Sequence, residues 1–94
     1  NNSVTAQFTH DWDLWLASDR RLKTDIKRIR TSPSGIPIYE FRFKDDLEIK
    51  WEGVIAQDLL EMGMNDVVGT NEDGYYTVNY SKIDVDQMQI VEEI

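Results

Sequence analysis

The feature that most constrains this chain is a long alternation of apolar and polar residues over positions 2–16. Apolar or aromatic side chains occupy the even positions from Val4 to Leu16, with His10 among them, and polar side chains occupy most odd positions. A period of two is typical of a β-strand that buries one face. The strand is long for a compact domain, where five or six residues are usual. We therefore expect it to pair with strands that this sequence lacks, or with copies of itself.

The chain has 94 residues, no cysteine and one histidine. A domain of this size buries only roughly 60–65% of its unfolded surface, so we expect it to need stabilisation from outside. The missing cysteines exclude disulfides and thiol catalysis, and one histidine excludes a multi-histidine metal site. We expect no metal and no cofactor. No apolar run approaches the ~18 residues of a membrane span, and no signal-peptide pattern opens the sequence. We expect no membrane partner, and the first residues resemble the interior of a longer protein.

Charge is distributed unevenly along the chain, whose formal net charge is −8. Residues 1–30 carry six basic and four acidic side chains, whereas residues 31–94 carry four basic and fourteen acidic ones. The acidic balance weighs against nucleic-acid binding, for which the short basic cluster between Arg20 and Arg30 is the one argument. Exposed Trp12, Trp15 and Trp51 would instead suit a glycan-binding tip, although these positions fit a core better.

The rest of the chain predicts a small mixed α+β domain of short strands and helices. Leu22, Ile26 and Ile29 have helical spacing and predict a short basic helix that Ser18 or Asp19 would cap. Further along, turn-forming residues at 31–35 predict a turn, and alternating apolar residues predict strands at 36–43 and 47–51. A helix is predicted at 54–62, where Gly63 would end it. A hairpin is predicted from strands 67–68 and 75–80, joined by the turn-forming residues 70–74.

A last helix is predicted over residues 81–94. Ser81 and Asp84 have the spacing of a capping box. Apolar spacings of four, three and four then follow the a/d rhythm of a coiled coil at Ile83, Gln87, Ile90 and Ile94. An amphipathic helix that packs on its own domain fits the same pattern, so both interpretations stay open.

Ser18 and Lys23 are the residues whose chemistry suggests catalysis. A serine hydroxyl needs a base to remove its proton, and a neutral lysine can serve when burial or neighbouring cations lower its pKa. Four cations, Arg20, Arg21, Lys27 and Arg28, crowd Lys23 in the sequence.

The spacing limits how this pair can meet. Residues five apart on one helix point about 140° apart, so Ser18 must lie at the end of a strand or the two residues must come from different chains. From spacing alone, a capping serine beside a solvated basic face is the better explanation of the segment, because a serine and a lysine five residues apart occur by chance in most proteins. His10 and Asp11 cannot form a dyad in a strand, because adjacent side chains point to opposite faces.

Three segments in a fixed order resemble a known family. They are SDRRLKTDI at 18–26, GVIAQDL at 53–59 and YYTVNYSKI at 75–83. Together they resemble the C-terminal intramolecular chaperone domain of phage tailspikes, tail fibres and endosialidases. A similar self-cleaving module occurs in a membrane-tethered eukaryotic transcription factor.

The resemblance implies a homotrimer in which residues 19–94 are the chaperone domain, residues 1–18 end a trimeric β-stalk, and residues 81–94 form a coiled-coil-like helix. Its partners would be its own copies and the upstream stalk of the same polypeptide. The domain would trimerise and fold that stalk and then release itself. It would belong to a tail fibre or tailspike precursor made in the host cytoplasm and be absent from the mature virion fibre. The alternative is a trimerisation tip that does not cleave.

Carried over to this sequence, the resemblance makes Ser18 the nucleophile and Lys23 the general base of a single-turnover serine endopeptidase. The cleavage site comprises Ala17, Ser18 and Asp19. Attack on the Ala17 carbonyl passes through a five-membered ring, whereas attack by Ser18 on its own carbonyl needs a four-membered ring. The family is usually described as cut after the serine, so the bond stays open. Residues that match the motifs without an assigned chemistry are Asp19, Arg20, Leu22, Gly53, Ala56 and Gln57.

Overall fold

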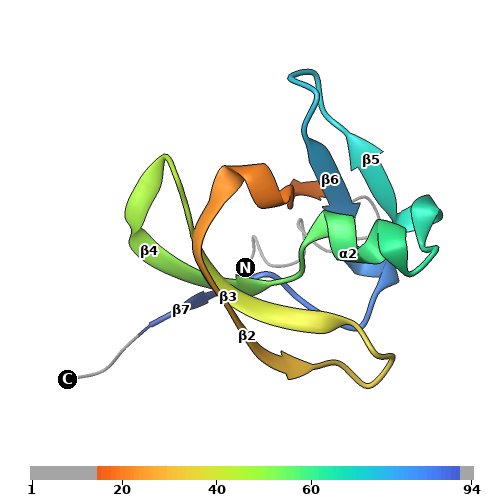
Figure 1. The fold of residues 1–94 in the computed structure, drawn as a ribbon, viewed down its shortest axis with the longest axis horizontal. Coiled ribbons are helices and arrows are strands. Elements are labelled where there is room, and N and C mark those ends of the chain that lie inside the picture. The colour runs from red at the N-terminus through yellow and green to blue at the C-terminus, as the bar shows by residue number, and fades with distance from the viewer. Residues whose placement is uncertain (1–14, 92–94) are drawn as a thin grey trace, which may run out of the picture.

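The computed structural model describes residues 15–91, which form two antiparallel sheets and one short α-helix (Figure 1). The three-stranded sheet has the order β1-β6-β5 and consists of β1 (Trp15–Ala17), β5 (Val68–Thr70) and β6 (Tyr76–Asn79). The four-stranded sheet has the order β2-β3-β4-β7 and consists of β2 (Lys23–Thr31), β3 (Pro37–Phe43), β4 (Asp46–Gly53) and β7 (Met88–Ile90). The helix α2 (Ala56–Glu61) contacts β5 and β6. Among residues 15–91, no helix is long and apolar enough to cross a membrane.

The middle of the chain folds as its patterns predict. β3 and β4 lie where alternation predicted strands, and α2 lies within the predicted helix. Gly63 follows α2 with a φ of +79°, and its amide bonds back to the Leu60 carbonyl, as expected of the glycine that ends a helix. The predicted hairpin joins β5 to β6, and the Asn71 side chain accepts the Asp73 and Tyr75 amides across the turn.

The predicted basic helix is wrong, because residues 23–31 form β2 and pair with β3. Two β2 residues lie opposite one β3 residue between Thr24 and Lys27, and one β2 residue has no opposite residue between Arg28 and Arg30, so β2 contains two bulges. Each bulge adds a residue and breaks the in-out alternation. Ile26 and Ile29 are half-buried three residues apart, a spacing that imitates a helix. Only a 3₁₀ turn, Arg20–Leu22, is helical here, and Asp19 caps it.

The predicted helix over residues 81–94 is also wrong within the part that the structure describes. Tyr80–Lys82 form a 3₁₀ turn, and Met88–Ile90 form β7 on the edge of β4. The expected capping partners bind elsewhere, since Ser81 bonds to Asn79 and Asp84 bonds to Ser34. A helix of about two heptads is marginal by itself, whereas the open edge of β4 satisfies the backbone of β7 directly.

Of the predicted N-terminal strand, the structure describes only Trp15 and Leu16, which form β1 together with Ala17. These residues, β1, pair with β6 of the same chain, so the expectation that the strand needs foreign partners is wrong for them. Residues 1–14 and 92–94 lie outside the described part, and with them His10, Asp11, Trp12 and Ile94.

The core that positions the candidate site contains buried polar groups beside its apolar ones. Its buried hydrophobic residues include Ile36, Ile38, Phe41, Val54, Ile55, Leu59, Val78 and Tyr80. Ser18, Asp19 and Lys23 are buried with them, at 0%, 0% and 3% exposure. A buried charge or hydroxyl is costly unless it is hydrogen-bonded, so the partners of these three residues define the site.

Candidate functional site

Ser18 is fixed where the two sheets and the helix meet. It follows β1 directly, and its amide donates to the Tyr76 carbonyl at 3.1 Å. Its carbonyl accepts the amide of Ala56, the first residue of α2, at 2.9 Å. The Ser18 hydroxyl donates to the Val54 carbonyl at 2.7 Å. Backbone bonds to β6 and α2 therefore hold the serine from both sides.

Lys23 reaches Ser18 within the same chain. The 3₁₀ turn over Arg20–Leu22 brings the start of β2 back beside the end of β1. Lys23 Nζ lies 3.1 Å from Ser18 Oγ, 3.3 Å from the Ser18 carbonyl oxygen and 2.6 Å from the Val54 carbonyl oxygen. Its nitrogen also lies 4.1 Å from the centre of the Phe41 ring. The serine lies outside a helix at a strand end, which is one of the two arrangements in which the spacing allows the pair to meet.

Burial lowers the pKa of Lys23 to about 7. Asp19 and Asp58 oppose this shift by favouring the charged amine, and Arg20 adds to it. The neighbouring cation is thus a smaller cause than desolvation, which penalises the ammonium form. A substantial fraction of the amine is neutral near pH 7, the protonation state that a general base requires.

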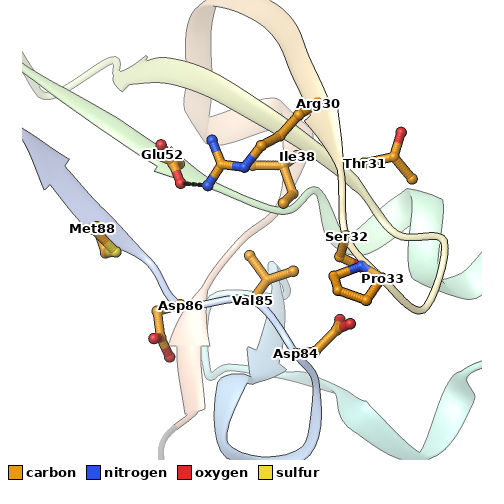
Figure 2. A pocket seen from close by; sticks show the side chains of 10 residues that line it. All are labelled: Arg30, Thr31, Ser32, Pro33, Ile38, Glu52, Asp84, Val85, Asp86 and Met88. Atoms are coloured by element: carbon orange, nitrogen blue, oxygen red, sulfur yellow. Dashed lines mark hydrogen bonds and ion pairs between the residues drawn. The ribbon is translucent and has the colours of Figure 1, made fainter.

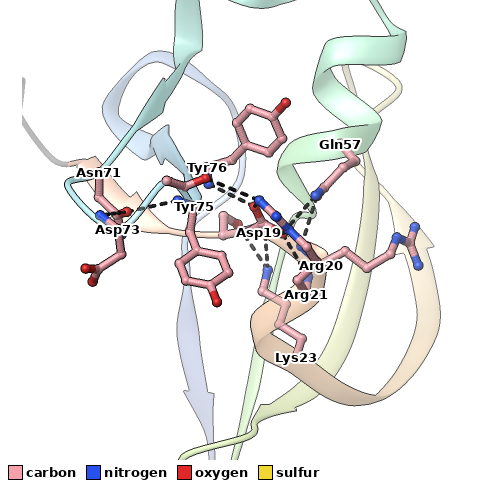
Figure 3. Close-up of polar contacts among 11 residues, drawn as sticks. Asp19, Arg20, Arg21, Lys23, Gln57, Asn71, Asp73, Tyr75 and Tyr76 are labelled. Carbon is pink, nitrogen blue, oxygen red and sulfur yellow. Dashed lines mark hydrogen bonds and ion pairs between the residues drawn. The ribbon is translucent and has the colours of Figure 1, made fainter.

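The carboxylate of Asp19 lies at the centre of a second cluster of polar groups next to Ser18 (Figure 3). Its carboxylate accepts the Arg21 amide at 2.8 Å, the Arg21 guanidinium at 3.0 and 2.8 Å, Gln57 Nε2 at 2.8 Å and the Tyr76 amide at 2.9 Å. The guanidinium of Arg21 is the main reason that the pKa of Asp19 lies well below its usual range. The cluster therefore anchors the residue after Ser18 to the turn, to α2 and to β6.

Sequence reasoning missed two members of the Ser18 site, Val54 and Tyr80. The Tyr80 hydroxyl oxygen accepts the Val54 amide at 3.2 Å, and it lies 3.2 Å from Ser18 Oγ and 3.4 Å from Gln87 Oε1. A Cβ on Gly53 would lie 2.8 Å from the Tyr80 hydroxyl oxygen, so the glycine makes room for it. Tyr80 stands in the third family-like segment, but nothing in that segment tells which tyrosine points inward.

Another cavity, away from this site, contains none of the predicted site residues (Figure 2). An ion pair between Arg30 and Glu52 crosses it, and its other lining side chains include Asp84, Val85, Asp86 and Met88. Within residues 15–91, no group of three or more His, Asp or Glu side chains is placed to hold a metal ion.

A comparison with protein families found one match. The model of Peptidase_S74, described as the chaperone of endosialidase, matches residues 18–69, which is more than half of the chain. The match begins at Ser18 and includes Lys23, Gly53 and Val54. No curated protein and no solved structure matched this chain.

Proposed function

Because the chain belongs to the Peptidase_S74 family, the chaperone of endosialidase, we propose that it is an intramolecular chaperone that assembles the stalk before it and then cuts itself off at Ser18. One observation supports the proposed cleavage most directly. A buried lysine amine with a pKa of about 7 lies 3.1 Å from a buried serine hydroxyl. Ser18 is the proposed nucleophile and Lys23 the proposed base.

For the Ala17–Ser18 bond, the reaction is an N-to-O shift followed by hydrolysis. Neutral Lys23 takes the proton of Ser18 Oγ, and Oγ bonds to the Ala17 carbonyl carbon through a five-membered ring. The carbon–nitrogen bond then breaks as the Ser18 nitrogen takes the proton back from Lys23. Water hydrolyses the ester, which leaves a carboxylate on Ala17 and a free amine on Ser18.

For the Ser18–Asp19 bond, the support comes from the donors on the Ser18 carbonyl oxygen. The Ala56 amide at 2.9 Å and Lys23 Nζ at 3.3 Å both point at this oxygen. Such donors stabilise the negative charge that develops when a carbonyl is attacked. The attacking hydroxyl would come from another protomer, because Ser18 itself would need a four-membered ring. The products of the two routes differ by one serine residue.

The chaperone part of the proposal concerns assembly. Interleaved β-stalks depend on contacts between distant residues and nucleate slowly. Three copies of this domain that associate first would hold three stalk strands close together and raise their effective concentration. Removal of the domain after assembly would leave the stalk without its easiest refolding route. The proposed partners are the domain's own copies and the upstream stalk, within a tail fibre or tailspike precursor made in the host cytoplasm.

Intact mass after expression tests the cleavage. We expect wild-type chain to yield two fragments whose masses identify the bond, and Ser18→Ala and Lys23→Ala to remain whole. Lys27→Ala is the matched control, because Lys27 is an exposed residue of the same strand. A wild-type chain that stays whole and trimeric would instead support the non-cleaving trimerisation tip.

Sedimentation of the uncleaved Ser18→Ala chain tests the assembly. We expect a trimer whose population grows with protein concentration. A monomer at every concentration would contradict the chaperone proposal, whatever the cleavage experiment finds.

A further inference from the structure

We propose that Tyr80 is a third catalytic residue, whose hydroxyl donates a hydrogen bond to Ser18 Oγ while this oxygen loses its proton to Lys23. The inference rests on the proposed self-cleavage. It adds a residue that lies 62 positions from the nucleophile and outside the segment that the family model matches.

The three side chains meet at one buried point. Ser18 Oγ lies 3.1 Å from Lys23 Nζ and 3.2 Å from the Tyr80 hydroxyl oxygen. Tyr80 is only 2% exposed. The backbone of Val54 links all three, because its carbonyl accepts from Ser18 and Lys23 while its amide donates to Tyr80. A single residue of the β4–α2 connection therefore sets the geometry of the three functional groups.

The proton of the Tyr80 hydroxyl has two possible acceptors. A phenol has one proton to donate. The Val54 amide already occupies an acceptor position of the Tyr80 oxygen, so the proton points either to Ser18 Oγ at 3.2 Å or to Gln87 Oε1 at 3.4 Å. Burial raises the pKa of Tyr80, so the hydroxyl keeps its proton at the pH where Lys23 becomes neutral.

The charge that develops during the reaction determines which of these two acceptors the Tyr80 proton binds. The proton of Ser18 Oγ moves to the Lys23 lone pair, and the Oγ electron pair forms the bond to the carbonyl carbon. Negative charge develops on Oγ, and a hydrogen bond to a charged oxygen is stronger than one to the neutral amide of Gln87. The Val54 carbonyl cannot stabilise the negative charge on Ser18 Oγ, because it has no proton to donate. The Tyr80 proton stays on its own oxygen throughout and stabilises the developing charge.

Tyr80→Phe tests this role in the full chain. We expect self-cleavage to slow about 10- to 100-fold, since one buried hydrogen bond to a charged group is lost. Tyr39→Phe is the matched control, because it removes a hydroxyl that bonds to Asp58 at 2.6 Å and is not in contact with Ser18. We expect this control to cleave at the wild-type rate. A folded Tyr80→Phe chain that also cleaves at the wild-type rate would overturn the inference.

The pH profile separates a catalytic role from a structural one. If Tyr80 acts on Oγ, Tyr80→Phe lowers the plateau rate but leaves the rising limb near pH 7. If the hydroxyl merely keeps the site closed, its loss admits water to Lys23 and moves the midpoint toward the ordinary lysine pKa. A shifted midpoint would therefore contradict the proposal.

Gln87→Met provides a second variant in case Tyr80→Phe fails to fold. Methionine has a similar shape but no amide oxygen, so the Tyr80 proton is left with Ser18 Oγ as its acceptor. We expect cleavage at least as fast as in the wild type, whereas a slower rate would contradict the role assigned to Tyr80. If the wild-type chain never cleaves, the proposed self-cleavage fails and this inference with it. If the wild type cleaves and Tyr80→Phe matches it, only this inference fails.

Discussion

Lys23 Nζ lies 3.1 Å from Ser18 Oγ, although on one helix these two residues would point about 140° apart. The chain brings them together by leaving β1 at Ala17, turning once through Arg20–Leu22 and entering β2 at Lys23. Asp19 stabilises the turn by accepting the Arg21 amide. A strand end, a capped turn and a strand start are thus sufficient to bring the hydroxyl and the amine together.

The rate of self-cleavage should rise with pH and level off above about pH 8. Lys23 acts as a base only when it is neutral, and burial lowers its pKa to about 7. Initial rates from denaturing gels between pH 5 and pH 9 measure this profile. Lys27→Ala should keep the wild-type midpoint. A midpoint near the ordinary lysine pKa of about 10.4 would show that Lys23 is hydrated in the reacting state.

Lys23 should also make the stability of the fold depend on pH. Its pKa is about 7 in the folded chain, against 10.5 when unperturbed. Between these values the unfolded chain binds more protons, so the free energy of unfolding rises with pH across this window. Below pH 7 both states are protonated and the full penalty of the buried ammonium is present.

Urea titrations of two uncleavable chains measure this contribution. In Ser18→Ala, we expect the free energy of unfolding to rise between about pH 7 and pH 10.5, by a few kcal/mol at most. In Ser18→Ala/Lys23→Met, this rise should be absent. Parallel curves for the two chains would mean that Lys23 is not buried in its neutral form.

Asp19→Asn should destabilise the chain by about 2–3 kcal/mol at pH 7, because a buried carboxylate with five donors loses its charge. Asp25→Asn is the control, since the Asp25 side chain is 62% exposed in its ion pair with Arg42 and should contribute less than about 1 kcal/mol. Chemical denaturation measures both. Equal effects would contradict the anchoring role of Asp19.

The same carboxylate predicts a loss of stability in acid. The pKa of Asp19 is lowered in the folded state, so its contribution is complete above the unfolded value of about 3.9 and is lost as the pH falls below it. Unfolding measured between pH 2 and pH 5 should show a smaller pH dependence for Asp19→Asn than for the unsubstituted chain.

Gly53→Ala should both destabilise the fold and slow cleavage. The new Cβ would lie 2.8 Å from the Tyr80 hydroxyl oxygen, and overpacking of a core typically costs about 1–3 kcal/mol. The double variant Gly53→Ala/Tyr80→Phe removes the clashing oxygen and should recover part of the lost stability. Thermal unfolding of the four chains in the cycle measures this coupling, and strictly additive effects would contradict the clash.

The patterns that predicted the fold correctly are local ones. Alternation predicted β3 and β4, and the glycine after α2 and the turn residues around Asn71 marked ends that the structure confirms. These signals depend on a residue and its near neighbours, so they can be recognised in the local sequence without knowledge of the rest of the chain. For residues 23–31 the same signals predicted a helix instead of a strand, because two bulges in β2 changed the spacing of the apolar residues.

The helix predicted for the last segment, residues 81–94, was wrong for another reason. The spacing from Ile83 to Ile90 suits a helix, yet residues 88–90 form β7 against β4. Its partner strand ends 35 positions earlier in the sequence. The Asp84 carboxylate accepts the Ser34 amide and hydroxyl instead of capping a helix. Helical propensity is weak beside the backbone bonds and packing that a sheet edge supplies.

The sequence by itself determined that Ser18 and Lys23 are the residues to examine, because their types and the three family-like segments can be read directly from the chain. Only the tertiary structure decided their environment. The Val54 carbonyl lies 31 positions from Lys23, and the Tyr80 hydroxyl lies 62 positions from Ser18. The pKa of Lys23 depends on burial by this folded core, and desolvation is a property of everything that surrounds a group in space rather than of its neighbours along the chain.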